Sequence, residues 1–407
     1  MNLAKPRVHI IGAGFSGLSV AYLLAKTERF DIMIYERDSK IGGMIQSSNK
    51  NGILVESGAN SILCTKETLS FLKEIEVSVI SPQATAKKRY FWRNGLSRWP
   101  LTILETFFLI PRLLFHLITL KKFIQFNHQQ SVADWSQKYF GSAFTHYVLS
   151  PGLQGIYATT ADHLNAKNVL GHLLKPREEK YKGIVSGRTG MFDVISALEK
   201  KCLSLNVKIN LNSVYDFTLP RDILIIATSN RDAAKMLMLQ DKALSFSLGK
   251  IEMNHVMSVT CKVQKSMRAK GFGCLIAENT ETKCLGVLFN SDIFAGRSQN
   301  QDLNETYIFS GREAEIIDKL EDQELTDYMK KARKKIFKTD NPLLEIHKAY
   351  WPKGLPIYNQ SLAEFQHTFI QGQNNTYLHG NYVVGIGLSK IIKNSQTIAK
   401  KIIKDFL

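Results

Sequence analysis

The stretch that decides the fold is VHIIGAGFSG at residues 8–17, which is followed by IMIYE at residues 32–36. The apolar, β-branched run 8–11 predicts a buried strand, and apolar residues recur at helical spacing from 16 to 26. The second apolar run predicts another strand. A strand, a helix and a strand within roughly 30 residues form the βαβ unit of a parallel sheet. We therefore expect an α/β domain here.

The glycines of this unit follow the pattern G-x-G-x-x-G, with Gly12, Gly14 and Gly17 between the first strand and the helix. Gly12 permits a tight turn, Gly14 lets the backbone approach a pyrophosphate, and Gly17 lets the helix pack closely on the strand. The helix begins at Phe15 and Ser16, and its N-terminus offers free N–H groups to phosphates. The unit therefore predicts a dinucleotide site.

The residues after the second strand favour FAD over NAD. Glu36 ends that strand, precedes Arg37, and can accept hydrogen bonds from ribose hydroxyls. A second glycine pair, Gly42-Gly43, follows and precedes Met44. Such a pair lets the chain pass close to the remainder of a larger dinucleotide, which simple NAD dehydrogenases do not need. We expect FAD as the cofactor.

From this point the chain resembles the amine oxidase superfamily of flavoproteins. The decapeptide GILVESGANS at residues 52–61 is similar to the signature G-F-x-x-E-x-G-P-N-S of the protoporphyrinogen oxidase family, with Ala59 in place of proline. Other segments resemble that family in the same order along the chain: SPGLQGIYA at 150–158, GRTGM at 187–191, WPKGLPIY at 351–358 and GNYVVGIG at 380–387. Ala59, the weakened glycine motif at 187–191 and a shortened segment 212–222 mark a divergent member.

The resemblance implies further residues that contact FAD. They are Gly58, Ala59, Asn60, Val207, Gly380, Gly385, Ile386 and Gly387. The last motif also has a physical reason, because its glycines let the backbone run against a flat ligand. The helix expected after it would point its N–H groups toward that ligand and stabilise negative charge on a reduced flavin.

The substrate site is expected at the basic and aromatic segment KKRYFWRNG, residues 87–95, which resembles the family strand whose arginine pairs with a substrate propionate. Arg89 is the residue that we expect to clamp a carboxylate, with Arg93 as the alternative partner. The resemblance also implies that Gly155 presents its backbone carbonyl to the substrate near the flavin, with Tyr157 beside it. An exposed basic edge strand remains the alternative interpretation of this segment.

The order of these patterns predicts three structural units. Residues 1–80, 190–250 and 376–407 are expected to form a discontinuous, Rossmann-like FAD-binding domain. Residues 81–96 and 251–375 are expected to form a mixed-sheet substrate-binding domain, and residues 97–189 an inserted helical domain. The fold class is therefore α/β, or α+β when the whole chain is considered.

The helical insert contains the most lipophilic stretch of the chain, residues 101–126. Glu105, Pro111 and Arg112 interrupt it, so we do not expect a spanning helix. A hairpin inserted in a membrane surface and a helix pair buried within the protein both remain open. The net charge of +17 indicates an anionic partner such as a membrane surface, a nucleic acid or a polyanionic substrate, or else simply solvated lysines on helices. No motif typical of nucleic-acid binding accompanies that charge, so we expect no nucleic acid partner.

The five cysteines lie at wide spacings without a C-x-x-C pair, so we expect small core residues in a reducing compartment and no metal site. We expect a cytoplasmic protein, with peripheral association on the cytoplasmic face of the membrane left open. A homodimer is also left open.

The expected activity is the oxidation of protoporphyrinogen IX to protoporphyrin IX in haem synthesis, by three two-electron steps with molecular oxygen as acceptor. Coproporphyrinogen III is the alternative tetrapyrrole substrate, because the two molecules differ only in substituents on the same ring. A carotenoid or squalene desaturase would share the FAD motifs without needing Arg89. A non-catalytic FAD-binding subunit and a nucleic-acid-binding module are the alternatives from other classes.

Overall fold

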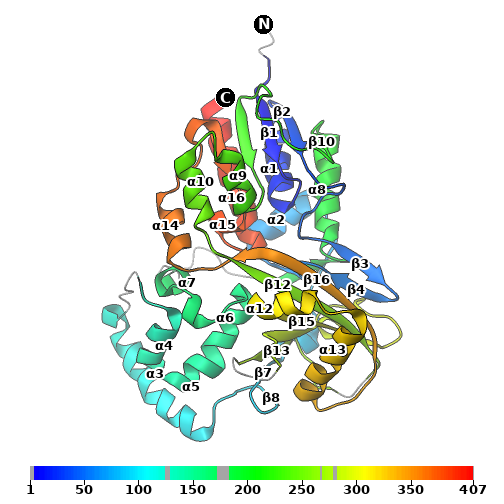
Figure 1. Ribbon diagram of the computed structural model, residues 1–407, viewed down its shortest axis with the longest axis vertical. Helices are drawn as coiled ribbons and strands as arrows, with labels where there is room; N and C mark the ends of the chain where they lie inside the picture. Colours follow the sequence, from blue (N-terminus) through cyan, green and yellow to red (C-terminus); the bar gives the residue numbers. More distant parts are fainter. Residues whose placement is uncertain (1–3, 124–128, 172–182, 266–267, 278–281, 407) are drawn as a thin grey trace.

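The computed structural model describes residues 4–123, 129–171, 183–265, 268–277 and 282–406. Its main parts are a parallel sheet between helices, a second and longer sheet, and a group of helices beside that second sheet (Figure 1). The predicted fold class, a Rossmann-like domain combined with a mixed sheet and a helical part, is confirmed. All five cysteines are buried and form no disulfide, as expected of core residues.

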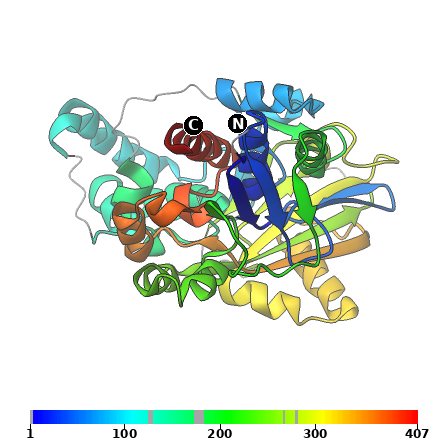
Figure 2. The ribbon, with the colours of Figure 1, turned by 90° about the horizontal axis from the view of Figure 1, so that it is seen from above.

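The first sheet is parallel throughout. In spatial order its strands are β10 (Lys208–Asn210), β2 (Asp31–Tyr35), β1 (Arg7–Ile11), β11 (Ile223–Ile226) and β17 (Thr376–Leu378). Helices cover both faces, and this double burial explains why β1, β2 and β11 are apolar runs. One face is covered by α1 (Phe15–Ala25), α2 (Lys66–Glu74), α8 (Phe192–Ser204) and α16 (Leu388–Phe406), and the other by α9 (Asn230–Leu237) and α10 (Lys242–Gly249) (Figure 2).

The second sheet is mixed and joins distant parts of the chain. In spatial order its strands are β16 (Leu343–Pro356), β12 (Met253–Val263), β15 (Leu303–Ser310), β14 (Gly286–Phe289), β13 (Gly273–Ile276), β7 (Arg89–Trp92) and β8 (Leu96–Ser97). The β7–β13 pair is parallel and the other neighbours are antiparallel. The helices α12 (Gly311–Asp318) and α13 (Asp322–Phe337) pack against this sheet.

A buried ionic cluster holds part of this second domain together. The Glu305 carboxylate accepts hydrogen bonds from Arg268 at 2.7 Å, from Arg333 at 3.2 Å and from the Tyr307 hydroxyl at 2.8 Å. Arg268 also donates to Asp292 at 2.7 Å, on the short helix α11 (Asn290–Ile293). The cluster therefore fixes α11, whose neighbouring side chains line the cavity described below.

The helical group lies beside the second sheet. It contains α3 (Ile103–Phe123), α4 (Val132–Phe140), α5 (Ser142–Phe144), α6 (Ser150–Tyr157) and α7 (Ala166–Leu170). No helix among the described residues is long and apolar enough to cross a membrane.

The predicted helical range 97–189 does not end in a helix. Its last described part contains β9 (Ile184–Gly187), which pairs with β5 (Ile62–Leu63) and β6 (Val79–Ile80). β9 therefore packs with β5 and β6 and not with the helical group. In the sequence, β5 and β6 come after the antiparallel pair β3 (Ser47–Lys50) and β4 (Ile53–Glu56). The chain ends through α14 (Gln360–Thr368), β17, α15 (Asn381–Val384) and α16.

Candidate functional site

The first glycine motif forms an open turn at the N-terminus of α1. Gly12 adopts φ +105°, and a Cβ on Gly17 would lie 2.0 Å from the Gly12 carbonyl oxygen. A Cβ on Gly14, by contrast, would meet nothing within 4 Å. Gly14 is also the N-cap residue, and no side chain accepts from the first N–H groups of the helix, which begins with Phe15 and Ser16. The turn therefore leaves room and donors for a phosphate.

The second glycine pair lies directly beside the first motif. The backbone of Gly42 forms an isolated parallel bridge with Gly14, and its N–H donates to the Ala13 carbonyl at 2.9 Å. Gly42 and Gly43 adopt φ +98° and +54°. A Cβ on Gly43 would lie 3.5 Å from the Cα of Gly14. The structure thus brings together two backbone segments that are 28 residues apart in the sequence.

Glu36 lies at the carboxyl end of β2, next to this turn. One carboxylate oxygen accepts from the Ala13 N–H at 2.8 Å, and the other accepts from the Asp38 N–H at 3.0 Å. Each carboxylate oxygen keeps a free lone pair for a ribose hydroxyl. The neighbouring Arg37 is exposed and pairs with Asp232 at 3.4 Å.

Val207 is not brought to this end of the sheet. Val207 immediately precedes β10. Since Lys208 lies opposite Met33, Val207 is level with Ile32, four residues before Glu36. At about 3.3 Å per residue this is roughly 13 Å from Glu36 along the strand. The Val207 side chain is buried in the main core, so its role in the structure is packing.

The residues expected around the flavin ring gather at the irregular part of β16 that contains Gly354. The Met44 methyl carbon lies 3.0 Å from the position of a Cβ on Gly354, and a Cβ on Gly58 would lie 2.2 Å from the Met44 carbonyl oxygen. From the C-terminal motif, the Asn381 amide donates to the Gly354 carbonyl at 2.9 Å. The structure therefore brings the second glycine pair, the decapeptide and the C-terminal motif to one region.

The C-terminal motif is fixed by a buried tyrosine. Gly380 is extended, whereas Gly385 adopts φ +109°. The Ile386 N–H donates to the Tyr358 hydroxyl at 3.0 Å, and that hydroxyl would lie only 2.6 Å from a Cβ on Gly385. Tyr157, from α6, packs its ring 4.6 Å from that of Tyr358. Tyr157 therefore links α6 to the glycine motif.

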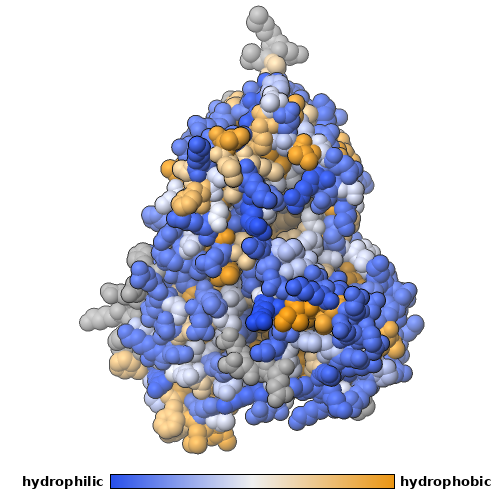
Figure 3. Space-filling view, in the orientation of Figure 1, coloured by the Kyte–Doolittle hydropathy of each residue, from blue (hydrophilic) through white to orange (hydrophobic). Residues whose placement is uncertain are grey.

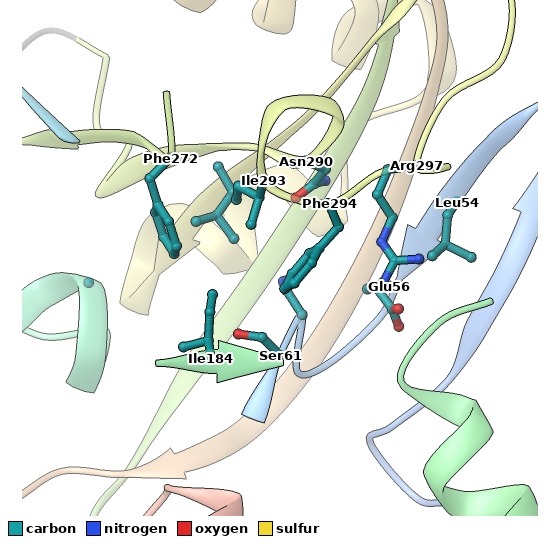
Figure 4. Close-up of a pocket in the computed structure, with 12 residues that line it drawn as sticks. Leu54, Glu56, Ser61, Ile184, Phe272, Asn290, Ile293, Phe294 and Arg297 are labelled. Carbon is teal, nitrogen blue, oxygen red and sulfur yellow. The ribbon is translucent and has the colours of Figure 1, made fainter. Parts of the chain in front are cut away.

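A cavity of about 250 Å³ lies between α6, the decapeptide and the second sheet (Figure 4). Of the predicted site residues it contains Asn60 and Gly155. The other lining residues are Leu54, Glu56, Ser61, Ile184, Phe272, Leu288, Asn290, Ile293, Phe294 and Arg297. Arg89 is exposed beside this cavity, with its guanidinium carbon 4.9 Å from the ring centre of Phe272. No carboxylate of the described residues pairs with Arg89.

Two buried charged side chains at one end of this cavity were missed by the sequence analysis. Glu56 accepts from the Ser47 hydroxyl at 2.6 Å and from the Met191 N–H at 2.8 Å. Burial outweighs these bonds and raises the pKa of Glu56 to about 7. Arg297 lies beside it in Figure 4, donates to the Ser186 hydroxyl at 2.7 Å, and has its pKa lowered by burial. Glu56 was within the quoted decapeptide, whereas no local pattern marks Arg297.

Arg93 has a different role from the predicted contact with substrate. Its guanidinium binds both carboxylate oxygens of Glu105, at 2.7 and 3.0 Å, and lies 3.7 Å over the ring of Tyr147. The bidentate pair lowers the pKa of Glu105 to about 2. Arg93 thus anchors the start of α3, and Arg89 alone of the two remains for a carboxylate ligand.

Known proteins share this arrangement. A family model described as an NAD(P)-binding Rossmann-like domain matches residues 10–75. Protoporphyrinogen oxidase 2 of Arabidopsis thaliana is 24% identical over 98% of the chain and 94% of its own length. Coproporphyrinogen III oxidase of Bacillus subtilis is 19% identical over 96% and 97%. Over nearly its whole length the chain is therefore similar to protoporphyrinogen and coproporphyrinogen III oxidases. A crystal structure of a candidate protoporphyrinogen oxidase from Exiguobacterium sp. 255-15 shares its fold, with TM-score 0.80 at 16% identity over 99% of the chain and 100% of the other.

The chain is an FAD-dependent oxidoreductase, like these relatives. The residues present fit that cofactor. The open space at Gly14 and the uncapped N-terminus of α1 suit a pyrophosphate, and Glu36 suits a ribose. FAD is therefore the cofactor for which this turn is built.

Proposed function

We propose that this protein oxidises protoporphyrinogen IX to protoporphyrin IX, with molecular oxygen as the electron acceptor. The observation that carries the proposal is the cavity that contains Gly155 and Phe272, with Arg89 unpaired beside it. The apolar part of the cavity wall, together with the Arg89 guanidinium beside the cavity, suits a flat macrocycle that carries propionates. The names of the relatives support the same substrate class.

The chain's own residues position the substrate rather than exchange protons with it. Arg89 holds a propionate at the rim, and Phe272 packs on both the guanidinium and the macrocycle. Gly155 directs its backbone carbonyl to the reacting carbon, and a side chain there would force a methyl group of Leu275, 2.7 Å from the Cβ position, to shift. FAD, held at the turn from Gly12 to Gly17 and by Glu36, would supply the hydride acceptor for three two-electron steps, each of which also releases one proton to solvent. Molecular oxygen would take up the electrons and leave as hydrogen peroxide.

The test is anaerobic mixing of the yellow purified protein with each porphyrinogen while the flavin absorbance is followed. We expect protoporphyrinogen IX to bleach the flavin, and readmitted oxygen to restore it. If neither protoporphyrinogen IX nor coproporphyrinogen III bleaches the flavin, the proposal fails. Faster bleaching by coproporphyrinogen III would assign that substrate instead.

Arg89 provides a sharper test of the substrate class. Arg89→Ala should raise the KM for porphyrinogen about 10- to 100-fold, because one charge-assisted hydrogen bond is lost. Arg89→Lys is the matched control that keeps the charge. An unchanged KM in Arg89→Ala, together with turnover of a neutral polyene, would indicate a desaturase.

We also propose that the exposed face of α3 binds the surface of an anionic membrane. Large apolar side chains gather on this helix, in the lower left of Figure 3: Ile103, Leu104, Phe107, Phe108, Ile110, Leu114 and Phe115. An apolar patch of this kind on a chain with net charge +17 suits an interfacial helix.

Flotation with vesicles that contain anionic lipid tests this surface. Phe107→Ser combined with Phe108→Ser should reduce vesicle binding at least tenfold, because each buried phenylalanine contributes roughly 1.5–3 kcal/mol. Phe246→Ser, which changes an exposed phenylalanine on α10, is the control and should bind like the unchanged protein. Equal binding by both variants would refute the membrane contact, and a dimer that dissociates in the double variant would show that a second copy covers the patch.

A further inference from the structure

Lys390 lies in the first turn of α16, directly against the C-terminal glycine motif. Its N–H donates to the Gly387 carbonyl at 2.9 Å. The Lys390 side chain folds back along the motif. A Cβ on Gly385 would lie 3.3 Å from the Lys390 Cδ and 3.4 Å from its Nζ, and a Cβ on Gly387 would lie 3.8 Å from its Cγ. The ammonium group is thus held beside the same backbone that we expect to run against the flavin ring.

The surroundings of Lys390 contain no negative charge to neutralise it. No carboxylate of the described residues forms an ion pair with the ammonium group. The nearest polar group at Gly385 is the Tyr358 hydroxyl, whose pKa is raised by burial, so this tyrosine stays neutral. The side chain is open to solvent on one side, yet burial by the surrounding protein lowers its pKa. A cation that lies beside this glycine-rich backbone, with no carboxylate partner among the described residues, favours an anionic ligand there.

Lys390 and the helix act in the same direction. The N-terminus of α16, with 19 residues, carries a partial positive charge close to Gly387. A reduced flavin carries its extra negative charge on the ring, and positive groups beside that ring favour reduction.

We infer that Lys390 is a positioning residue that stabilises the negative charge of reduced FAD and raises its reduction potential. The inference rests on the proposed place of the flavin ring beside residues 380–387. It does not depend on which porphyrinogen is oxidised.

The test compares Lys390→Met, which keeps an unbranched stem without charge, with Lys390→Arg, which keeps the charge. The midpoint potential of bound FAD is measured against a reference dye during slow anaerobic reduction, and the affinity for sulfite, which adds to oxidised flavin as an anion, is measured by titration. In Lys390→Met we expect the ratio of reduced to oxidised FAD at a given potential to fall about tenfold, which is about 30 mV for a two-electron couple. Sulfite affinity should fall by a similar factor. Lys390→Arg should stay close to the unchanged protein in both measurements.

Lys400→Met is the matched control on the same helix. It removes the same charge ten residues further on, or roughly 15 Å along the axis, so it should leave the potential unchanged. Lys390→Gln, studied with FAD in excess, serves as a second neutral variant and should show the same fall as Lys390→Met.

Unchanged potential and sulfite affinity in both neutral variants would overturn the inference. A raised KM for porphyrinogen with an unchanged potential would overturn it too, because Lys390 would then bind a substrate carboxylate. The potential and the sulfite affinity are measured without porphyrinogen turnover. If neither porphyrinogen bleaches the flavin but the potential falls in Lys390→Met, the proposed function fails and the role of Lys390 is upheld. If a porphyrinogen bleaches the flavin but the potential is unchanged in the variant, the proposed function stands and the role of Lys390 is refuted.

Discussion

Glu56 makes the stability of the protein depend on pH in a direction opposite to that of an ordinary carboxylate. Its pKa rises from 4.5 to about 7 in the folded protein, because burial disfavours the ionised form. Between these two values the unfolded chain releases the proton while the folded protein keeps it. The folded state is therefore progressively destabilised as the pH rises from 4.5 to about 7, and the loss is complete above that range.

The change to test is Glu56→Gln, whose side chain stays neutral at every pH. The amide oxygen can accept from the Met191 N–H, and the amide nitrogen can donate to the Ser47 hydroxyl oxygen, so both present contacts have replacements. The pKa rise corresponds to roughly 3 kcal/mol at 1.36 kcal/mol per pH unit. We expect the variant to gain most of that free energy of unfolding relative to the unchanged protein between about pH 5 and about pH 8.

The assay is equilibrium unfolding in urea of the unchanged protein and of Glu56→Gln, each near pH 5 and near pH 8 and at the same excess of FAD. Glu105→Gln is the control, because the pKa of Glu105 lies at about 2 and its carboxylate is ionised at both pH values. That control should lose the same stability at each pH. A difference between Glu56→Gln and the unchanged protein that is equal near pH 5 and near pH 8 would refute the reasoning.

Further predictions concern single side chains. Gly14→Ala should leave the melting temperature of the apoprotein unchanged but lower FAD affinity at least tenfold, because its Cβ enters the open space at the helix N-terminus, and FAD titration checks this. Gly17→Ala should instead prevent stable folding, seen as a lost thermal transition, because its Cβ would lie 2.0 Å from a backbone oxygen. Gln154→Met should raise the free energy of unfolding by about 1–3 kcal/mol, since neither polar atom of this buried amide has a hydrogen-bond partner among the described residues. A lower free energy of unfolding in urea titration would show that the amide is bonded. Arg93→Ala should lower the free energy of unfolding by about 1–3 kcal/mol, because Glu105 loses both hydrogen bonds, and it should leave the KM for porphyrinogen nearly unchanged. A large rise in that KM would show that Arg93 binds the substrate.

The sequence was most informative where chemistry is local. The turn from Gly12 to Gly17, the strand that ends at Glu36 and the helix that begins at Leu388 were all predicted within a few residues. Each of these is specified by glycine geometry or by an apolar period that a short window contains.

The sequence was least informative where partners are distant. Glu56 and Arg297 meet at one end of the cavity although 241 positions separate them, and no spacing rule connects them. The strands β15 and β16 were not predicted, because their side chains do not alternate clearly between apolar and polar. Arg93 resembled a ligand for substrate only until its carboxylate partner, Glu105, was known.

The last elements of the chain, β17 and α16, complete the sheet that the first elements begin. β17 is the neighbour of β11, and α16 packs against α1. During synthesis β1 and α1 leave the ribosome long before α16 does. The apolar surface of α1 that packs against α16 therefore stays uncovered by that helix until α16 has been made, and transiently exposed apolar surface of this kind promotes aggregation.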